Sequence, residues 1–247
     1  MTTSQWRKRV KKIEGSGHDL VLKTIDKVTK EHGTCCEKVC DAIAAWFAKY
    51  ANDGKVSYAE AVRLNRMLEL IDCIDDELEN TTEEEDHHIE LLVAALLALY
   101  SKKLDKEFTV DDFQTKWMMD DIWYSNNLKD NEIMLLFYIR NDLKQALARG
   151  DKLTDILAQV RKRFRTSATS LGSLIQTRCT DYESDVMRDW LVATGHSKYM
   201  WVTINDGKQC DDCDAMDGLI FDIRDYERGV TAPTLHRHCR CQIAPAD

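Results

Sequence analysis

The chain has 247 residues, of which 44% are apolar, so it can bury a sizeable core and is expected to fold rather than remain disordered. Its formal charge of −9 argues against a surface that coats nucleic acid or anionic membrane indiscriminately, because like charges repel phosphate at long range. The N-terminal MTTSQWRKRVKK lacks the apolar run of a secretory signal, and the most apolar stretch, residues 89–100, is too short to span a bilayer. We therefore expect a protein kept in a cytosol, without a membrane partner.

The body of the chain is predicted to be helical. Both prolines, Pro233 and Pro245, lie in the last fifteen residues, so the strongest helix breaker is absent from everything before them. Thr81 and Thr82 precede three glutamates, which is typical of a helix start with acids at the positive end of the dipole. Apolar periodicity and turn chemistry place helices in the N-terminal half at residues 6–30, continuous or kinked at the GSG of 15–17, and at 35–50, 57–71 and 81–104.

The second half is predicted to hold three more helices and then a different kind of structure. The helices are placed at residues 131–149, 153–164 and 167–193, with Asn131 as a cap and with Gly150 and Gly195 as stops. From Gly195 onward lie four of the ten glycines and both prolines, and KYMWVTI at 198–204 has the aromatic and β-branched content of a strand. Gly218 is expected to turn the chain before a short second strand at 219–221.

The C-terminal cysteines have the spacing of metal ligands. In a reducing compartment, clustered cysteines are more often ligands or buried apolar residues than disulfides. A CxxC is followed, after 22 intervening residues, by an HxxC, and this pattern matches a closed tetrahedral zinc site, whose ion suits thiolate and imidazole. The predicted ligands of this structural Zn²⁺ are Cys210, Cys213, His236 and Cys239, with Cys241 as the alternative fourth ligand and His238 less favoured. Free thiols without a metal are the alternative interpretation.

The predicted fold class is mainly α, with a multi-helix body and a small C-terminal zinc-stapled β-rich module. The expected domains are an N-terminal helical region at 1–115, a second helical portion at 116–195 and the zinc module at 196–247. The aspartates between the two ligand pairs lack the regular alternation of a calcium loop, so we interpret them as a solvated turn.

The segment from Trp201 to Pro245 resembles a known family. Its WxxxxD, CxxCxxxxGxxF and PxxHxxCRC motifs occur in the order found in the C-terminal module of phage head morphogenesis proteins, the Mu F-like minor capsid proteins. The preceding tryptophan-containing segment, Trp117 to Trp123, and the helices after it also fit, so the resemblance covers about residues 117–245. In the long helix the family often has Arg or Ile, then Thr and Glu, whereas this chain has QTRC at 176–179, and no role is carried over from that Glu.

The resemblance implies a phage minor head protein, present in a few copies and associated with the portal or the inner capsid. Such a protein would act in head morphogenesis or DNA delivery, with portal and capsid proteins as partners and with no small-molecule substrate. It would be found in the host cytoplasm during assembly and afterwards in the virion. These expectations come from the family and not from the ligand spacing.

The alternative function is a zinc-containing nucleic-acid-binding module. It would use the cations and imidazoles of residues 236–240 together with the basic run Arg161, Lys162, Arg163 and Arg165, although helical charge runs are usually just solvated. No catalytic residues are predicted, because the sequence lacks GxSxG, a phosphate loop, HExxH and the HxE with PCxxC of zinc deaminases. A third hypothesis, an enzyme effector like some secreted toxins, is therefore not supported by any set of catalytic residues in the sequence.

Two other clusters are expected to be structural. Cys35, Cys36 and Cys40, near His32, point in different directions from a helix and are interpreted as core thiols. Cys73 and Cys179 are expected to act as small apolar residues. The EEEDHH run at 83–88 is interpreted as a solvated first helical turn rather than a metal cluster.

Overall fold

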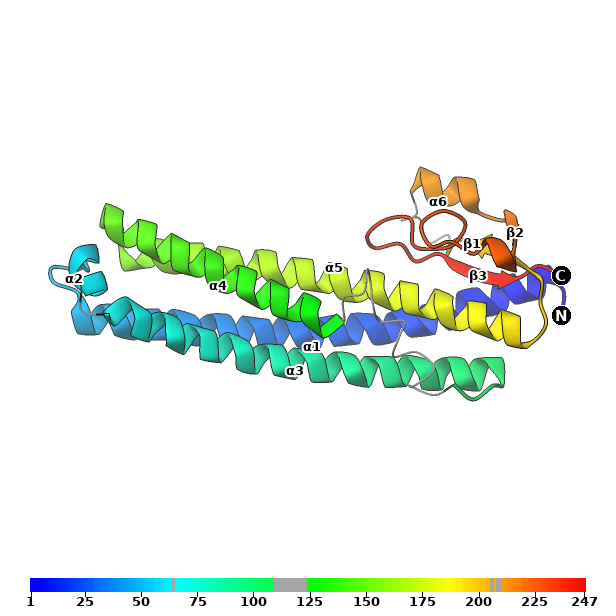
Figure 1. Cartoon of the computed structure of the whole chain (residues 1–247), viewed down its shortest axis with the longest axis horizontal. Coiled ribbons are helices and arrows are strands. Elements are labelled where there is room, and N and C mark those ends of the chain that lie inside the picture. Colours follow the sequence, from blue (N-terminus) through cyan, green and yellow to red (C-terminus); the bar gives the residue numbers. More distant parts are fainter. Residues whose placement is uncertain (64, 109–123, 205–206, 208–209) are drawn as a thin grey trace. The chain divides into compact units, whose positions relative to one another are not determined.

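The computed structural model describes residues 1–63, 65–108, 124–204, 207 and 210–247. The described chain is mainly helical with a small C-terminal sheet, as predicted, while Trp117 to Trp123 lie outside the described residues. None of the described helices combines the length and apolarity needed to cross a membrane. The elements (Figure 1) are α1 (Thr3–Tyr50), α2 (Tyr58–Arg63), α3 (Arg66–Leu104), α4 (Tyr124–Arg149), α5 (Leu153–Ala193), β1 (Lys198–Val202), α6 (Asp211–Met216), β2 (Ile220–Asp222), a 3-10 helix (Ile223–Asp225) and β3 (Gln242–Pro245).

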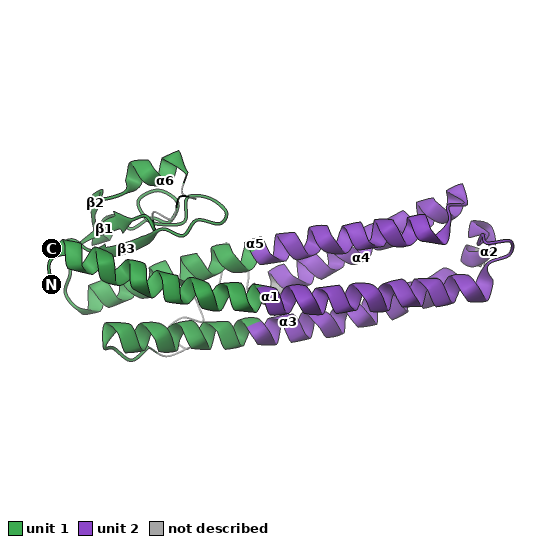
Figure 2. Cartoon of the chain, turned by 180° about the vertical axis from the view of Figure 1, so that it is seen from behind, with its two compact units in different colours: residues 1–25, 89–123, 173–247 green, residues 26–88, 124–172 purple. Residues whose placement is uncertain are grey.

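The chain divides into two compact units, each assembled from segments that are distant in sequence (Figure 2). Unit 1 comprises residues 1–25, 89–123 and 173–247, and unit 2 comprises residues 26–88 and 124–172. Helices α1, α3 and α5 each contribute one part to unit 1 and another part to unit 2. The division into 1–115, 116–195 and 196–247 stays a prediction.

The helix α1 runs unbroken through the GSG at residues 15–17, where a kink was one of two expectations. Packing within unit 1 explains one of these glycines. A Cβ at Gly17 would collide with the side chain of Glu183 and would lie 3.4 Å from Cδ2 of Leu96. This glycine therefore allows a close approach between α1 and its neighbours rather than interrupting the helix.

The predicted helix breaks at Tyr50 and at Gly150 are correct, but several others are wrong. Residues 35–50 belong to the same helix as 6–30, residues 153–164 continue into 167–193, and α3 passes through the predicted start at Thr81. The Oγ1 of Thr81 donates to the carbonyl of Glu77 at 2.8 Å, so the side chain satisfies its hydrogen bond inside the helix.

Polar residues that look like caps in the sequence have partners on other helices of unit 2. Asn131 lies inside α4, where its Nδ2 donates to Oγ of Ser167 at 2.8 Å. The EEEDHH run lies inside α3 and so is not a first helical turn, and within it Glu85 is buried, with its Oε1 3.0 Å from Nδ1 of His32. Gly150 and Gly195 do end their helices, with φ of 72° and 78°.

Unit 2 has an apolar core supplied by α1, α2, α3, α4 and α5. Fully burying one large side chain in such a core contributes about 1.5–3 kcal/mol. Cys35, Cys36 and Cys40 belong to this core, as predicted, whereas Cys73 is exposed, which corrects the expectation for that residue. Side chains at the centre of the core include Val39, Ile43, Ile74, Ile139, Leu143, Val160 and Phe164.

Unit 1 carries a three-stranded antiparallel sheet in the order β2-β1-β3. The central strand β1 pairs Tyr199 with Phe221 of β2 and with Pro245 of β3. Both faces of β1 are covered from Tyr199 to Val202, as expected for a central strand with packing on each side. Gly218, with φ of 84°, makes the predicted turn, and β2 begins one residue later than predicted. The two connections of this sheet hold the candidate metal ligands.

Candidate metal centre

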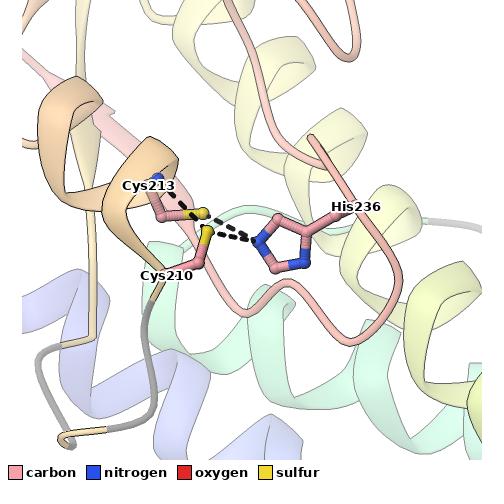
Figure 3. Close-up of side chains that lie close together, drawn as sticks. All are labelled: Cys210, Cys213 and His236. Atoms are coloured by element: carbon pink, nitrogen blue, oxygen red, sulfur yellow. Dashed lines mark hydrogen bonds between the residues drawn. The ribbon is translucent and has the colours of Figure 1, made fainter.

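The CxxC pair lies at the start of α6. Cys210 is the N-cap residue, with extended backbone angles, and its Sγ accepts a hydrogen bond from the backbone N–H of Cys213 at 3.4 Å. Cys213 lies in the first helical turn and is buried. This turn directs both sulfurs toward Nε2 of His236, which lies 3.1 Å from each of them (Figure 3).

The imidazole of His236 is oriented by its other nitrogen. The Nδ1–H donates to the backbone carbonyl of Arg237 at 2.8 Å. This hydrogen bond places the proton on Nδ1 and leaves the lone pair of Nε2 facing the two sulfurs. The ring is therefore held in the tautomer that a metal ligand requires.

Cys239 and Cys241 approach from the connection between β2 and β3. The Sγ of Cys239 lies 3.8 Å from the Sγ of Cys213. Two groups of possible ligand atoms, each within 4.8 Å of one another, occur in the described chain: Cys210, Cys213 and His236, and Cys213, Cys239 and Cys241. Because Cys213 belongs to both groups, the structure gathers all five predicted side chains around one sulfur.

The donor set and its spacing fit structural zinc. Zinc–sulfur bonds of about 2.3 Å in a tetrahedron separate two sulfurs by about 3.8 Å, and Cys213 and Cys239 have this separation at 3.8 Å. A sulfur and an imidazole nitrogen on the same ion lie about 3.5 Å apart, so His236, at 3.1 Å, needs only a small outward shift. Sulfur and nitrogen donors suit zinc better than calcium or magnesium, which prefer oxygen.

The side chains border open space rather than tightly packed atoms. A cavity of about 330 Å³ is lined by Cys213, His236, Cys239 and Cys241, together with side chains from α1 and α5. Around it, Trp201 packs with the three buried thiols of residues 213, 239 and 241 in a small apolar cluster. The candidate ligands thus form much of the module's own core.

Protons are unevenly distributed among the thiols. The hydrogen bond from the Cys241 thiol lowers the pKa of Cys239 to about 6, and that same bond, with burial, raises the pKa of Cys241. Burial raises the pKa of Cys213 to about 12. A bound metal requires thiolates, so its binding would release the protons that these thiols hold in its absence.

One face of α5 holds the loop that carries the last ligands. The Oγ1 of Thr180 donates to the carbonyl of Cys239 at 2.8 Å in a buried hydrogen bond. The backbone N–H of His238 donates to Oγ1 of Thr177 at 3.3 Å, and its imidazole Nδ1 lies 3.0 Å from Oε1 of Gln176. His238 is thus hydrogen-bonded to α5, while Thr180 orients the peptide of a candidate ligand.

Charged residues of unit 1 add contacts that sequence reasoning missed. Arg240 donates to both carboxylate oxygens of Glu14 at 2.8 and 3.1 Å, joining the ligand loop to α1. Asp185 on α5 accepts a hydrogen bond from Tyr226 at 3.0 Å and pairs with Arg228. Asp181, one turn earlier, accepts a hydrogen bond from Thr234 at 2.6 Å. The charged sequence of α5 normally predicts a solvated face, and no local signal distinguishes these buried acids.

The basic run predicted for nucleic acid lies in unit 2. Arg161 pairs with Glu37 at 2.9 Å, and Arg163 pairs with Asp142 at 2.6 Å. Lys162 and Arg165 are exposed. Two of the four cations therefore have carboxylate partners within the protein, and nucleic-acid binding stays a prediction.

Comparison with known proteins supports the resemblance found in the sequence. Residues 138–244 match the family described as phage Mu protein F like protein. The match begins inside α4 and contains α5, all three strands up to Ala244 and the five candidate ligands. Searches of curated proteins and of solved structures found no match.

Proposed function

We propose that this chain, whose residues 138–244 form a phage Mu protein F like segment, is a minor phage head protein that acts in head morphogenesis or DNA delivery. The family match is the observation that carries the proposal. It covers the part of the chain that gathers the candidate ligands, so the family match and the candidate metal centre fall in one segment. The proposed function follows from the family, and the proposed metal site would help that segment hold its shape.

The metal centre is proposed to be a structural zinc site formed by Cys210, Cys213, His236 and Cys239, with Cys241 as the alternative fourth ligand. Four protein donors close the tetrahedron and leave no position for a substrate. When bound, Zn²⁺ would supply folding free energy to a module whose sheet has only three short strands. The residues themselves position the ligands: Thr180 holds the peptide of Cys239, and Arg240 ties the loop to Glu14.

The proposed partners are portal or inner capsid proteins in assembling heads. The module would offer them a rigid surface, because its loops make polar contacts to α5 and α1 and would also be held by the proposed zinc. The proposed location is the host cytoplasm during assembly and the virion afterwards.

Purified procapsids test the function. In a host infected by the phage that carries this gene, the tagged chain is expected to cosediment with procapsids and to remain in mature heads at a copy number far below that of the main capsid protein. A Cys213→Ser variant is expected to lose this association, while the matched Cys36→Ser variant, which changes a core thiol of unit 2, is expected to keep it. Absence of the unmodified chain from procapsids and heads throughout infection would contradict the proposal.

A further inference from the structure

Unit 2 exposes its large apolar side chains on one group of elements. In the described residues of unit 2, these side chains have exposed fractions between 39% and 54%, and none lies on α1 or α5. Single exposed apolar residues are ordinary, whereas a concentration of them is typical of an interaction surface. They are Val62 on α2, Leu68 on α3, and Ile133, Met134, Phe137 and Tyr138 on α4.

A groove occupies the space between α2, the first turns of α3 and α4. Its volume is about 220 Å³. Ala61, Met67 and Ile71 are the buried part of its lining, and the exposed Val62 and Leu68 also border it. The side formed by α2 and α3 is therefore mainly apolar, with Tyr58 and Asn65 as its polar members.

The α4 side of the groove is cationic. Arg140 and Lys144 border it, one helical turn apart, and both are exposed. In the described part of the chain neither of them makes an ion pair, although Arg149, Arg161 and Arg163 of the same unit all do. Like charges one turn apart repel each other, and a carboxylate placed between them would relieve that repulsion. In a chain with a net charge of −9, two cations without an ion pair among the described residues, beside an apolar groove, favour an acidic ligand.

The same face of α4 continues beyond the groove. Ile133, Phe137, Arg140 and Lys144 are spaced at i, i+4, i+7 and i+11, which places them in one stripe along the helix. The stripe is apolar in its first half and cationic in its second half. A ligand that follows it must be apolar at one end and acidic at the other.

We propose that Val62, Leu68, Phe137, Arg140 and Lys144 form a docking surface, here called the α4 groove, for an amphipathic segment of another protein that carries apolar side chains and carboxylates. Such a segment would fill the apolar lining and pair with Arg140 and Lys144. The proposal rests on unit 2 alone and is independent of the head-protein function and of the metal.

Selection from a random peptide library tests the ligand chemistry. A ribosome-displayed library is panned against the full chain, and enriched peptides are expected to combine apolar residues at helical spacing with Asp or Glu. Synthetic copies are then titrated by fluorescence anisotropy. Binding is expected to weaken by more than about tenfold in the triple variant Leu68→Asp, Arg140→Glu, Lys144→Glu.

A matched triple variant controls for added charge. Leu91→Asp, Lys162→Glu, Arg165→Glu changes the same residue types at exposed positions outside the groove and is expected to bind like the unmodified chain. A double variant Arg140→Glu, Lys144→Glu is expected to regain binding when the acids of the peptide are replaced by lysine. Circular dichroism checks that each variant keeps its helical content.

Several results would overturn the proposal. They are an absence of enriched peptides, enrichment of basic peptides, and equal binding to the groove variant and the control variant. Sedimentation of the chain without peptide supplies another: self-association that disappears in the groove variant would show that a second copy of this chain, rather than another protein, occupies the surface.

Discussion

The two units use cysteine in opposite ways. Cys36 and Cys40 of unit 2 are buried, as are Cys213 and Cys239 of unit 1, and each pair includes a contact between the two thiols. In unit 2, however, both thiols project from one helix among apolar side chains. In unit 1 the thiols come from separate connections of the sheet and converge with an imidazole. Burial therefore does not separate core thiols from candidate metal ligands, whereas convergence of donors does.

The difference reflects how much apolar packing each unit can supply. Unit 2 packs long helices around a continuous core of aliphatic and aromatic side chains, so its thiols only fill space. The sheet of unit 1 is small, and its thiols form the centre of a local cluster with Trp201. A small β module has little core of its own, and the proposed zinc would supply the stabilisation that packing does not.

Removing the metal is expected to have the largest effect. Structural zinc contributes about 10 kcal/mol or more to the folding of such modules. Chelation, or Cys213→Ser, should therefore abolish amide-exchange protection in residues 198–245 while the helices of unit 2 stay protected. Elemental analysis should find about one zinc per chain before chelation. Full amide-exchange protection of the strands after complete zinc removal would contradict the proposal that zinc stabilises this fold.

Serine substitutions at the two candidates for the fourth zinc ligand are expected to have the next largest effect. Cys239→Ser is expected to lower zinc affinity by more than about a hundredfold, and Cys241→Ser by less than about tenfold. The reason is the 3.8 Å separation of Cys239 from Cys213, which matches the edge of a zinc tetrahedron. Competition with a chromophoric chelator measures the zinc affinity of both variants. A larger loss of affinity in Cys241→Ser than in Cys239→Ser would make Cys241 the fourth ligand.

Thr180→Val tests the support that α5 gives to the ligand loop. The change leaves the buried carbonyl of Cys239 without its hydrogen bond, which typically costs about 1–3 kcal/mol. Denaturant unfolding of the zinc-loaded chain should show this loss. Thr169→Val is the control, because the exposed Thr169 hydroxyl donates to a carbonyl of its own helix. The free energy of unfolding should fall much less in this variant than in Thr180→Val.

Substitution of Glu183, the buried acid that lies against Gly17, is expected to have the smallest effect on stability. Burial raises the pKa of Glu183 well above its usual range, so the folded state holds this proton more tightly than the unfolded state. The resulting stability is complete below the unfolded pKa of about 4.5 and is lost as pH rises toward the folded value. Glu183→Gln, which stays neutral, should raise Tm at pH 8 by about 2–4 °C and leave it nearly unchanged at pH 4. A larger gain at pH 4 than at pH 8 would contradict this explanation.

The helix boundaries show where local signals fail. Thr81 and Asn131 are cap-forming residue types in cap-like surroundings, yet both lie inside helices. Their side chains satisfy hydrogen bonds to a carbonyl of the same helix and to Ser167 on α5. Gly150 and Gly195 were predicted correctly, because glycine adopts the left-handed backbone conformation common at helix ends without the steric cost that a Cβ brings.

The sequence by itself determined the mainly helical composition, the helix stops at these glycines, the resemblance of the C-terminal segment and the set of five candidate ligands. Ligand spacing is readable because a CxxC turn or an HxxC turn needs only a few consecutive residues to bring two donors together. Tertiary structure alone decided which segments form each unit, why Asp181 and Asp185 are buried, and that Arg240 meets Glu14, 226 residues away. Such contacts depend on partners far along the chain, and no local pattern encodes them.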